Sequence, residues 1–257
     1  MNLKQVAVLM CVALMGAGAF AYSFLGPPTA ELEKISRKNE RGNTFSRHED
    51  KSSYIFSFSQ QNIGIDGVLM SGKIEDAEIT RHYYSWGVAL DENFNFNLLL
   101  GAVSAEADGE YFDDINATSD FGGDYGFSVG FNFKSTFVHG DTVDWGAMVQ
   151  TTYFSTEDTI DDHNVEFDDM YDIQIAVGPT IDMDGWKLYG GAYYYLLDGH
   201  LDISGSMYSE SVDVDEDDEF GIFAGAQFEI MENTDLVIEG AMGDDHYGIG
   251  LSIGMRF

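Results

Sequence analysis

The chain has 257 residues and carries 45 acidic against 12 basic side chains, which gives a net charge of −33 at pH 7. A field of this sign repels phosphate groups, so the charge excludes a nucleic-acid-binding protein. The chain is 44% hydrophobic and 14% aromatic, which excludes a disordered acidic protein, because such proteins lack the apolar residues that form a core. The length suits one large domain or two small ones, and an all-β barrel reaches this size as a single unit.

The first 21 residues predict a secretory signal peptide. Lys4 supplies the positive charge, residues 6–15 form the apolar stretch, and Ala-Phe-Ala at 19–21 gives the small-x-small cleavage pattern. An N-terminal membrane anchor is the alternative, although the apolar run is short for a bilayer span. Cys11 lies inside this segment. The mature chain is therefore expected to be exported without disulfides.

A change of charge near residue 51 predicts a domain boundary. Seven of the 12 basic residues and five of the 45 acidic residues lie in the first 51 positions, so residues 52–257 carry about −35. Residues 22–51 predict a flexible, near-neutral tail, because the Pro-Pro and Gly-Asn pairs at 27–28 and 42–43 interrupt regular structure. A short helix over 30–39 is compatible with this tail. We therefore divide the chain into residues 1–21, 22–51 and 52–257.

From residue 52 onward, apolar residues recur at every second position, which predicts β-strands. In 249–257 the residues Ile, Leu, Ile, Met and Phe alternate with Gly, Ser, Gly and Arg. In 125–133 large apolar residues alternate with Gly, Ser, Gly and Asn. The same alternation covers 94–102, 173–181 and 220–230. No segment after residue 52 shows sustained helical spacing, so the fold class is all-β.

The two faces of these strands predict a barrel that is turned inside out. One face is uniformly apolar, whereas the other carries Gly, Ser, Ala, Asn and Gln with an occasional charge such as Lys134 or Glu239. A soluble barrel would instead carry many Lys and Glu residues on its outer face. Large apolar residues that meet lipid and small polar residues that line a narrow lumen fit better, so we expect a transmembrane antiparallel up-and-down β-barrel. A secreted, soluble ligand-binding barrel is an alternative.

The links between the expected strands alternate between short and long, as in transmembrane barrels with tight periplasmic turns and longer outer loops. The short links lie near 91–93, 139–142, 182–185 and 231–233. The long links lie near 103–123, 155–169 and 198–218. Two further links at the same end as the long ones, at 61–77 and 243–246, are shorter. Ten strands are expected, at 52–60, 78–90, 93–102, 123–138, 142–155, 170–182, 185–197, 219–230, 234–242 and 246–257. An even number of strands leaves the first and the last strand with their free ends on the same side. We place this side, with the short turns and the 22–51 tail, in the periplasm. Residues 63–70 are an alternative first strand, and eight strands are the alternative count.

The closing stretch 248–257 resembles the C-terminal signature of bacterial outer-membrane β-barrel proteins. In that family a terminal aromatic residue, here Phe257, follows alternating hydrophobic residues and is recognised by the barrel assembly machinery. The resemblance implies that the protein lies in the outer membrane of the Gram-negative cell envelope, contacts its lipid and is inserted by that machinery. It names no subfamily. Trp145 and Trp186 follow short turns and would lie in an aromatic girdle, or else be ordinary core residues.

The three long links hold 21 of the 40 acidic residues that lie beyond position 51. Because oxygen ligands suit Ca²⁺ and Mg²⁺, these links are candidates for binding divalent cations, and no other cofactor is expected. The weak candidate ligands are Asp161, Asp162, Asp168, Asp169, Asp213, Asp215, Glu216, Asp217 and Asp218. No link keeps the EF-hand spacing, because 213–218 lacks the central glycine and the distal glutamate. A solvated, self-repelling rim is the alternative interpretation.

Two motifs place carboxylates beside a histidine on the expected outer rim, namely Asp161-Asp162-His163 and Asp244-Asp245-His246. Omptin proteases, also ten-stranded, use aspartates and an Asp–His pair in that region, so an omptin-like hydrolase is an alternative function. The expected strands, however, are too short to raise such a site above the membrane, and the sequence has no nucleophile elbow or phosphate loop. We therefore expect no enzyme, but a structural, adhesive or narrow-pore (porin-like) barrel with acidic extracellular loops.

Overall fold

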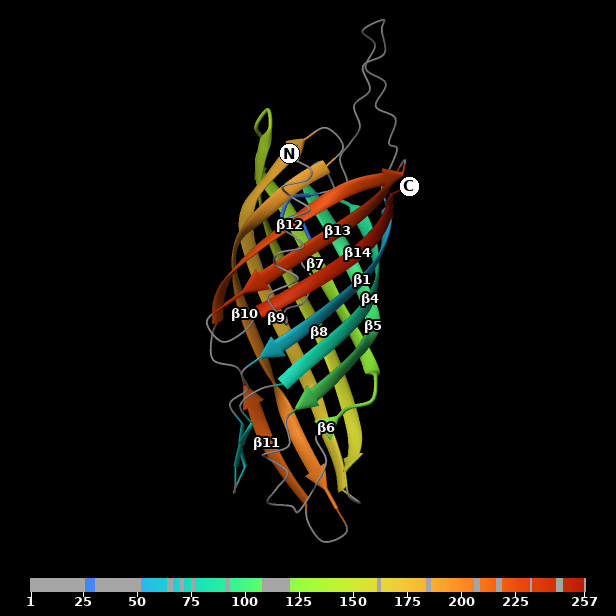
Figure 1. Cartoon of the computed structure of the whole chain (residues 1–257), viewed down its shortest axis with the longest axis vertical. Coiled ribbons are helices and arrows are strands. Elements are labelled where there is room, and N and C mark those ends of the chain that lie inside the picture. Colours follow the sequence, from blue (N-terminus) through green and yellow to red (C-terminus); the bar gives the residue numbers. More distant parts are fainter. Residues whose placement is uncertain are drawn as a thin grey trace, which may run out of the picture.

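The structure is a computed structural model, and its described part is all β (Figure 1). It describes residues 26–30, 52–63, 67–69, 72–74, 77–90, 93–107, 121–160, 163–183, 186–205, 209–215, 219–231, 233–243 and 247–256. Ten long antiparallel strands close into a barrel, which confirms the expected fold class and strand count. No helix in this part of the chain combines the length and the apolar character needed to cross a bilayer.

The ten barrel strands follow one another around the ring. They are β1 (Ser52–Ile63), β4 (Ala77–Ala89), β5 (Phe94–Ala107), β7 (Gly126–Val138), β8 (Val143–Ile160), β9 (His163–Met183), β10 (Trp186–Ser204), β12 (Glu219–Met231), β13 (Thr234–Met242) and β14 (Tyr247–Arg256). Four shorter strands lie outside the ring: β2 (Gly67–Leu69) pairs with β3 (Gly72–Ile74), β6 (Phe121–Gly122) with β5, and β11 (Ser209–Asp215) with β10.

The first strand closes the barrel. β1 pairs with β4 on one side and with β14 on the other, where Phe56 lies opposite Ile253 and Phe58 opposite Leu251. This register places the apolar residues of both strands on one face. The alternative first strand over 63–70 and the alternative count of eight are therefore wrong.

The two ends of the barrel differ as the link lengths predicted. The start of β1 and the end of β14 are paired, and the four short links that join β4 to β5, β7 to β8, β9 to β10 and β12 to β13 lie at the same end. We call this the turn end, and the opposite end the hairpin end. In Figure 1 the turn end is at the top.

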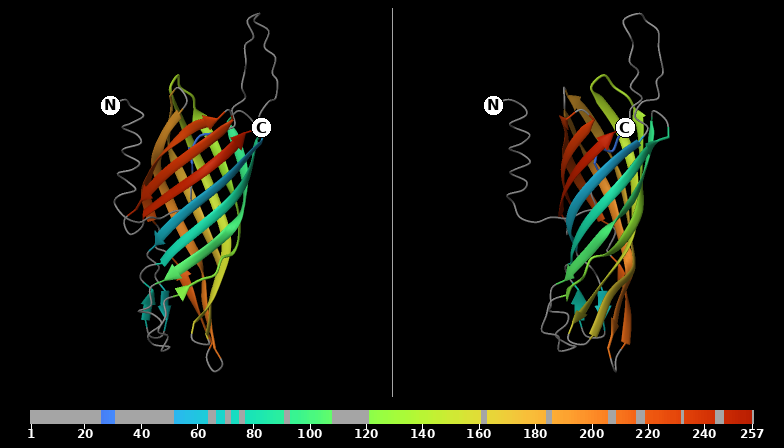
Figure 2. Two further views of the ribbon diagram at one scale, coloured as in Figure 1. Left: turned by 45° about the vertical axis from the view of Figure 1, so that its right-hand side comes forward. Right: turned by 90° about the vertical axis from the view of Figure 1, so that its right-hand side faces the viewer.

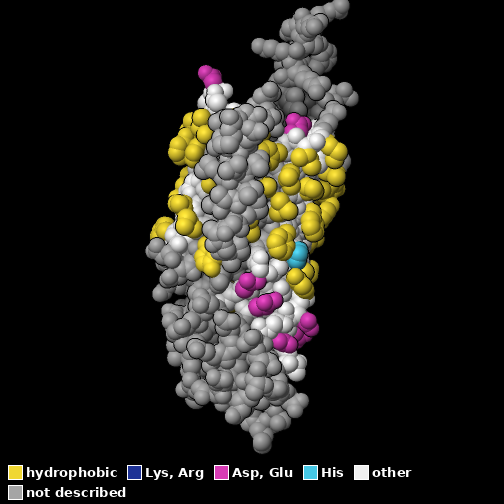
Figure 3. Space-filling view, in the orientation of Figure 1, with side chains coloured by type: hydrophobic (Ala, Val, Ile, Leu, Met, Phe, Trp, Pro, Cys, Tyr) yellow, Lys and Arg dark blue, Asp and Glu magenta, His cyan; other side chains and the backbone are white. Residues whose placement is uncertain are grey.

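Side chains alternate between the two faces as the inside-out pattern predicted. On β7, Phe127 and Phe131 expose 65% and 45% of their surface, whereas Ser128 and Asn132 expose 0% and 3%. In Figure 3, hydrophobic side chains cover the part of the visible face nearer the turn end, and acidic side chains lie beyond them toward the hairpin end. The barrel thus presents an apolar belt outward and small polar residues inward, as a lipid environment requires.

Strands continue beyond the belt where the sequence predicted long loops over 155–169 and 198–218. β8, β9 and β10 have 18, 21 and 19 residues, and with β11 they project past the other strands of the barrel (Figure 2). We call residues 155–160, 163–169 and 198–204 together with β11 the β extension. The expectations of long loops there, and of strands too short to rise above the membrane, are therefore wrong.

A bulge in β9 changes the face on which the apolar residues of the β extension lie. Between the pairs Phe154–Met170 and Thr156–Phe167 the register with β8 shifts, and Asp169 has a positive φ of 50°. An extra residue reverses the face to which the following side chains point. Val165 consequently joins Phe167 and Met170 in the interior. The apolar residues thus change from the lipid side to the inner side.

Five residues of the expected tail lie inside the barrel at the turn end. Gly26–Ala30 are all buried. The Thr29 hydroxyl donates to Thr180 Oγ1 at 3.0 Å, and the Ala30 amide donates to Thr136 Oγ1 at 2.8 Å. This stretch is therefore not the flexible tail that was expected. The signal peptide over 1–21 and the short helix over 30–39 lie outside the described residues, apart from Ala30.

Candidate functional site

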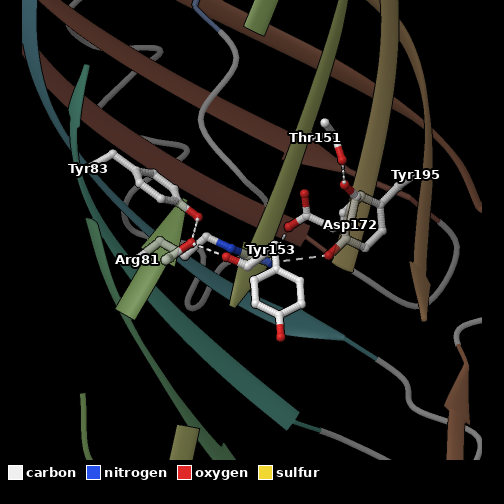
Figure 4. A network of polar contacts seen from close by, with 7 residues as sticks. Arg81, Tyr83, Thr151, Tyr153, Asp172 and Tyr195 are labelled. Atoms are coloured by element: carbon white, nitrogen blue, oxygen red, sulfur yellow. Dashed lines mark hydrogen bonds and ion pairs between the residues drawn. The ribbon is translucent and has the colours of Figure 1, made fainter. Parts of the chain in front are cut away.

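A layer of buried side chains crosses the lumen where the membrane-spanning barrel meets the β extension (Figure 4). Arg81 on β4 and Asp172 on β9 are both fully buried and form an ion pair, with Nη2 and Oδ2 separated by 2.9 Å. The same Arg81 nitrogen donates to the Tyr195 hydroxyl at 3.2 Å. The guanidinium also lies 5.5 Å from the centre of the Phe154 ring, a cation–π contact. Because each charge has a partner, this layer can stay buried.

Tyr83 completes the layer on the side of β4. Its hydroxyl lies 3.0 Å from Ser128 Oγ, and Ser128 in turn donates to the Tyr153 carbonyl at 3.0 Å. Since the serine proton is used in that bond, the Tyr83 hydroxyl is the donor to Ser128. The Tyr83 ring lies against Gly101, where a Cβ would come within 2.5 Å of it. The glycine therefore makes room for the ring.

On the hairpin side of this layer, the lumen is filled by an apolar core. Its side chains come from β4, β5, β6, β8, β9, β10 and β11, and each exposes 3% of its surface or less: Ala77, Ile79, Val103, Ala105, Phe121, Phe154, Val165, Phe167, Met170, Leu197, Leu201, Ile203 and Val214. The rings of Phe121 and Phe167 meet edge to face at 5.1 Å. Each large side chain of this kind contributes about 1.5–3 kcal/mol when buried. The core closes the lumen at the hairpin end.

On the turn side of the layer lies a polar chamber of about 50 Å³. Asn97 donates to Asn132 at 3.2 Å, and Asn132 donates to Gln150 at 2.9 Å, so three neighbouring strands are joined by one row of side-chain amides along its wall. Tyr83 borders the chamber, and so does Gly26 from the N-terminal segment. A space of this size holds a few water molecules.

The structure separates the acidic residues that were candidates for binding a cation. Asp168 and Asp169 lie at the β9 bulge, and Asp213 and Asp215 lie on β11, whereas Asp161, Asp162, Glu216, Asp217 and Asp218 fall outside the described residues. Asp169 accepts a hydrogen bond from the Tyr153 hydroxyl. Within the described ranges, no three His, Cys, Asp or Glu side chains converge as metal ligands. Binding of Ca²⁺ or Mg²⁺ therefore stays a prediction.

His200 is a candidate that the sequence did not single out. Its Nδ1 lies 3.1 Å from Asp213 Oδ1, and Asp168 is its cross-strand neighbour on β9. The residues of the two histidine motifs at 161–163 and 244–246 are outside the described part, except for the backbone of His163 at the start of β9. His200 was missed because its aspartate lies on another strand, and only the pairing of β10 with β11 brings them together.

A row of carboxylates crosses the outer face of the β extension. Glu157, Glu166 and Asp202 lie directly opposite one another on β8, β9 and β10. Partial burial and the charges of Asp168, Glu157 and Asp202 raise the pKa of Glu166 above its ordinary value. The row therefore concentrates negative charge beyond the apolar belt.

Comparisons with known proteins identify similar barrels. No family model and no curated protein matches the chain. The outer membrane protease OmpT from Escherichia coli has a TM-score of 0.49 and 10% identity, over 81% of this chain and 97% of that one. The translocator domain of the autotransporter NalP from Neisseria meningitidis has a TM-score of 0.45 and 13% identity, over 80% and 88%. The β domain of the Bordetella autotransporter BrkA has a TM-score of 0.45 and 12% identity, over 81% and 99%. All three are bacterial outer-membrane β-barrels, and these likenesses concern the fold alone.

Proposed function

We propose that the protein is an outer-membrane barrel with a closed lumen, which holds the β extension above the membrane and acts structurally or adhesively. The observation that carries this proposal is the filled interior, in which the buried Arg81–Asp172 pair is backed by the apolar core. A ten-stranded barrel is narrow enough for side chains to fill. The outward apolar belt supports a lipid environment, because a water-soluble barrel would place such residues inside.

The orientation follows from the same asymmetry. In this proposal the signal peptide over 1–21 directs export, and the assembly machinery recognises the last strand through Phe257. The turn end faces the periplasm, and the β extension with its acidic outer face is exposed on the cell surface. Long outer parts and tight periplasmic turns are the usual arrangement of such barrels.

Conductance across a planar lipid bilayer tests the closed lumen. The folded protein should give no steady channels, because no continuous aqueous path passes the layer and the core. A variant that combines Arg81→Ala, Tyr83→Ala and Tyr195→Ala with Phe121→Ala and Phe167→Ala removes large side chains from both the layer and the core, and it should increase the leak. Steady channels in the unaltered protein would contradict the proposal and support a narrow pore.

A hydrolytic role is the second candidate, and the His200–Asp213 pair favours it. A carboxylate beside an imidazole can orient it as a general base. The test compares peptide hydrolysis by the unaltered protein, by His200→Ala and by His139→Ala, since His139 also lies near an aspartate, Asp144 at 3.7 Å, but at the turn end. Hydrolysis that is lost only in His200→Ala would support this role. Absence of hydrolysis in the unaltered protein would remove it.

A further inference from the structure

The N-terminal segment Gly26–Ala30 fits a specific strip of the barrel wall. The strip consists of Thr136, Gly146 and Thr180, which lie on the adjacent strands β7, β8 and β9, and we call it the docking strip. Its two threonines hydrogen-bond to Ala30 and Thr29. At Gly146 an added Cβ would lie 2.5 Å from the Pro28 carbonyl oxygen, so only a glycine lets the segment lie this close. The segment and the wall are therefore matched in shape.

The chemistry of the segment allows it to enter and leave the lumen. Pro27 and Pro28 have no backbone N–H, so the segment brings fewer donors that need partners when it is buried. Prolines also restrict the backbone in advance, which lowers the entropy lost on docking. Gly26 takes a positive φ of 69°, which glycine adopts without strain. The segment forms no β-ladder with the barrel, so its release breaks no strand pairing.

The segment also borders the polar chamber. Gly26 is part of the chamber wall, and Tyr83 borders the chamber on the side of the buried layer. Beyond that layer the apolar core fills the lumen. Through the described part of the barrel, solutes can therefore reach the chamber from the turn end, where Gly26–Ala30 lies.

We propose that Gly26–Ala30 is a releasable stopper that controls the entry of small polar solutes into the lumen chamber from the turn end. Docked on the strip, it narrows the way into the chamber. When it is released, the row of amides and serine hydroxyls in the chamber becomes accessible. This proposal does not depend on which side of the membrane the turn end faces.

The experiment measures chemical access to the chamber through a single cysteine. Ser57 lines the chamber, so Ser57→Cys is introduced into the full chain with Cys11→Ser, which leaves no other thiol. The folded protein is treated with a small charged methanethiosulfonate, and the rate of modification is recorded. Adding Gly146→Ala should displace the stopper and accelerate modification by about tenfold, which corresponds to a loss of about 1.4 kcal/mol of docking free energy. The matched control is Gly240→Ala, where the nearest atom to an added Cβ is 3.4 Å away, and its rate should not change.

A second variant covers the case in which Gly146→Ala does not fold. Replacement of residues 26–30 by Gly-Ser-Gly-Ser-Gly keeps the chain length and every barrel strand, but removes both prolines and the Thr29 hydroxyl. It should accelerate modification as well. Equal rates with and without the native segment would overturn the proposal. So would a parent protein that reacts as fast as an exposed reference thiol, introduced as Asp141→Cys, since the chamber would then be open.

Discussion

At the scale of single residues, the Arg81–Asp172 pair determines how the lumen is held closed. Either charge alone would be buried without compensation, which costs about 3–5 kcal/mol. We expect Arg81→Met to lower the free energy of unfolding by about this amount and Arg81→Met with Asp172→Leu to recover most of it, because paired removal leaves no buried charge. Urea unfolding in lipid vesicles, followed by tryptophan fluorescence, measures both.

Lys187→Met is the control for this comparison. The Lys187 ammonium lies 4.0 Å from Asp182, whose side chain is 63% exposed, so water screens the remaining charge. An exposed pair of this kind contributes about 0–1 kcal/mol. A loss in Arg81→Met no larger than in Lys187→Met would show that the buried pair does not stabilise the barrel.

The stability of the β extension should depend on pH through Glu166. Its pKa is raised in the folded protein, by burial first and then by Asp168, Glu157 and Asp202. The folded state therefore binds the proton more tightly than the unfolded chain does. Stability should rise as the pH falls through the raised pKa toward the ordinary value of a glutamate.

Glu166→Gln tests this effect. The variant should be more stable than the parent at pH 7 and should show a smaller gain between pH 7 and pH 5. Melting of the extension, followed by hydrogen exchange at each pH, provides the measurement. Glu229→Gln, an exposed carboxylate at the end of β12, is the control and should leave the pH dependence unchanged.

The buried pair also shows what a sequence can and cannot reveal about a site. Arg81 was not singled out from the sequence, although a rare cation in a strand whose other face is apolar must face the lumen. Its partner was not visible, because Asp172 lies 91 residues away and only ring closure brings β4 and β9 to one lumen. The His200–Asp213 contact depends instead on the pairing of β10 with β11, which the sequence pattern did not predict. Strand alternation is local, whereas the Arg81–Asp172 contact depends on the whole ring.

At the scale of elements, alternation in the sequence predicted all ten strands but not their full length. The prediction began β9 at residue 170, next to the aspartates at 168–169 that interrupt the apolar alternation. The structure shows that β9 begins at His163 and that the bulge at Asp168–Asp169 moves Val165 and Phe167 inward. Two adjacent aspartates look like the start of a loop. The acidic outer face of the extension strengthened this impression of a loop.

Deletion of Asp169 tests the role of the bulge. Without the extra residue, Val165 and Phe167 would point toward solvent and Glu166 into the apolar core. We expect the β extension to unfold while the membrane-spanning part stays folded, seen as rapid hydrogen exchange confined to residues 155–167 and 198–215. Asp169→Gly keeps the residue count and suits the positive φ, so it should retain protection. Protection of the extension in the deletion variant would show that the bulge is dispensable.

At the scale of the whole molecule, most basic side chains are separated from the hairpin end. The basic side chains whose surroundings are described beyond residue 52, namely Arg81, Lys134, Lys187 and Arg256, occupy inward positions of their strands. Six further basic residues lie at 31–51, in the segment that joins Ala30 at the turn end to β1. The hairpin end carries carboxylates instead, and Lys73 on β3 is the basic residue that the sequence places there.

This separation makes trypsin, which cuts after Lys and Arg, a probe of orientation. On intact cells it should cut at Lys73 and nowhere else, because the other described basic side chains lie in the lumen and the proposed topology places residues 31–51 in the periplasm. A Lys73→Gln variant should resist trypsin on intact cells but should be cut within 31–51 once the outer membrane is permeabilised. A protease that cuts after glutamate should cleave the hairpin end of the same variant in intact cells, which confirms that the surface is accessible. Tryptic cleavage within 31–51 on intact cells would place the turn end outside and reverse the proposed topology.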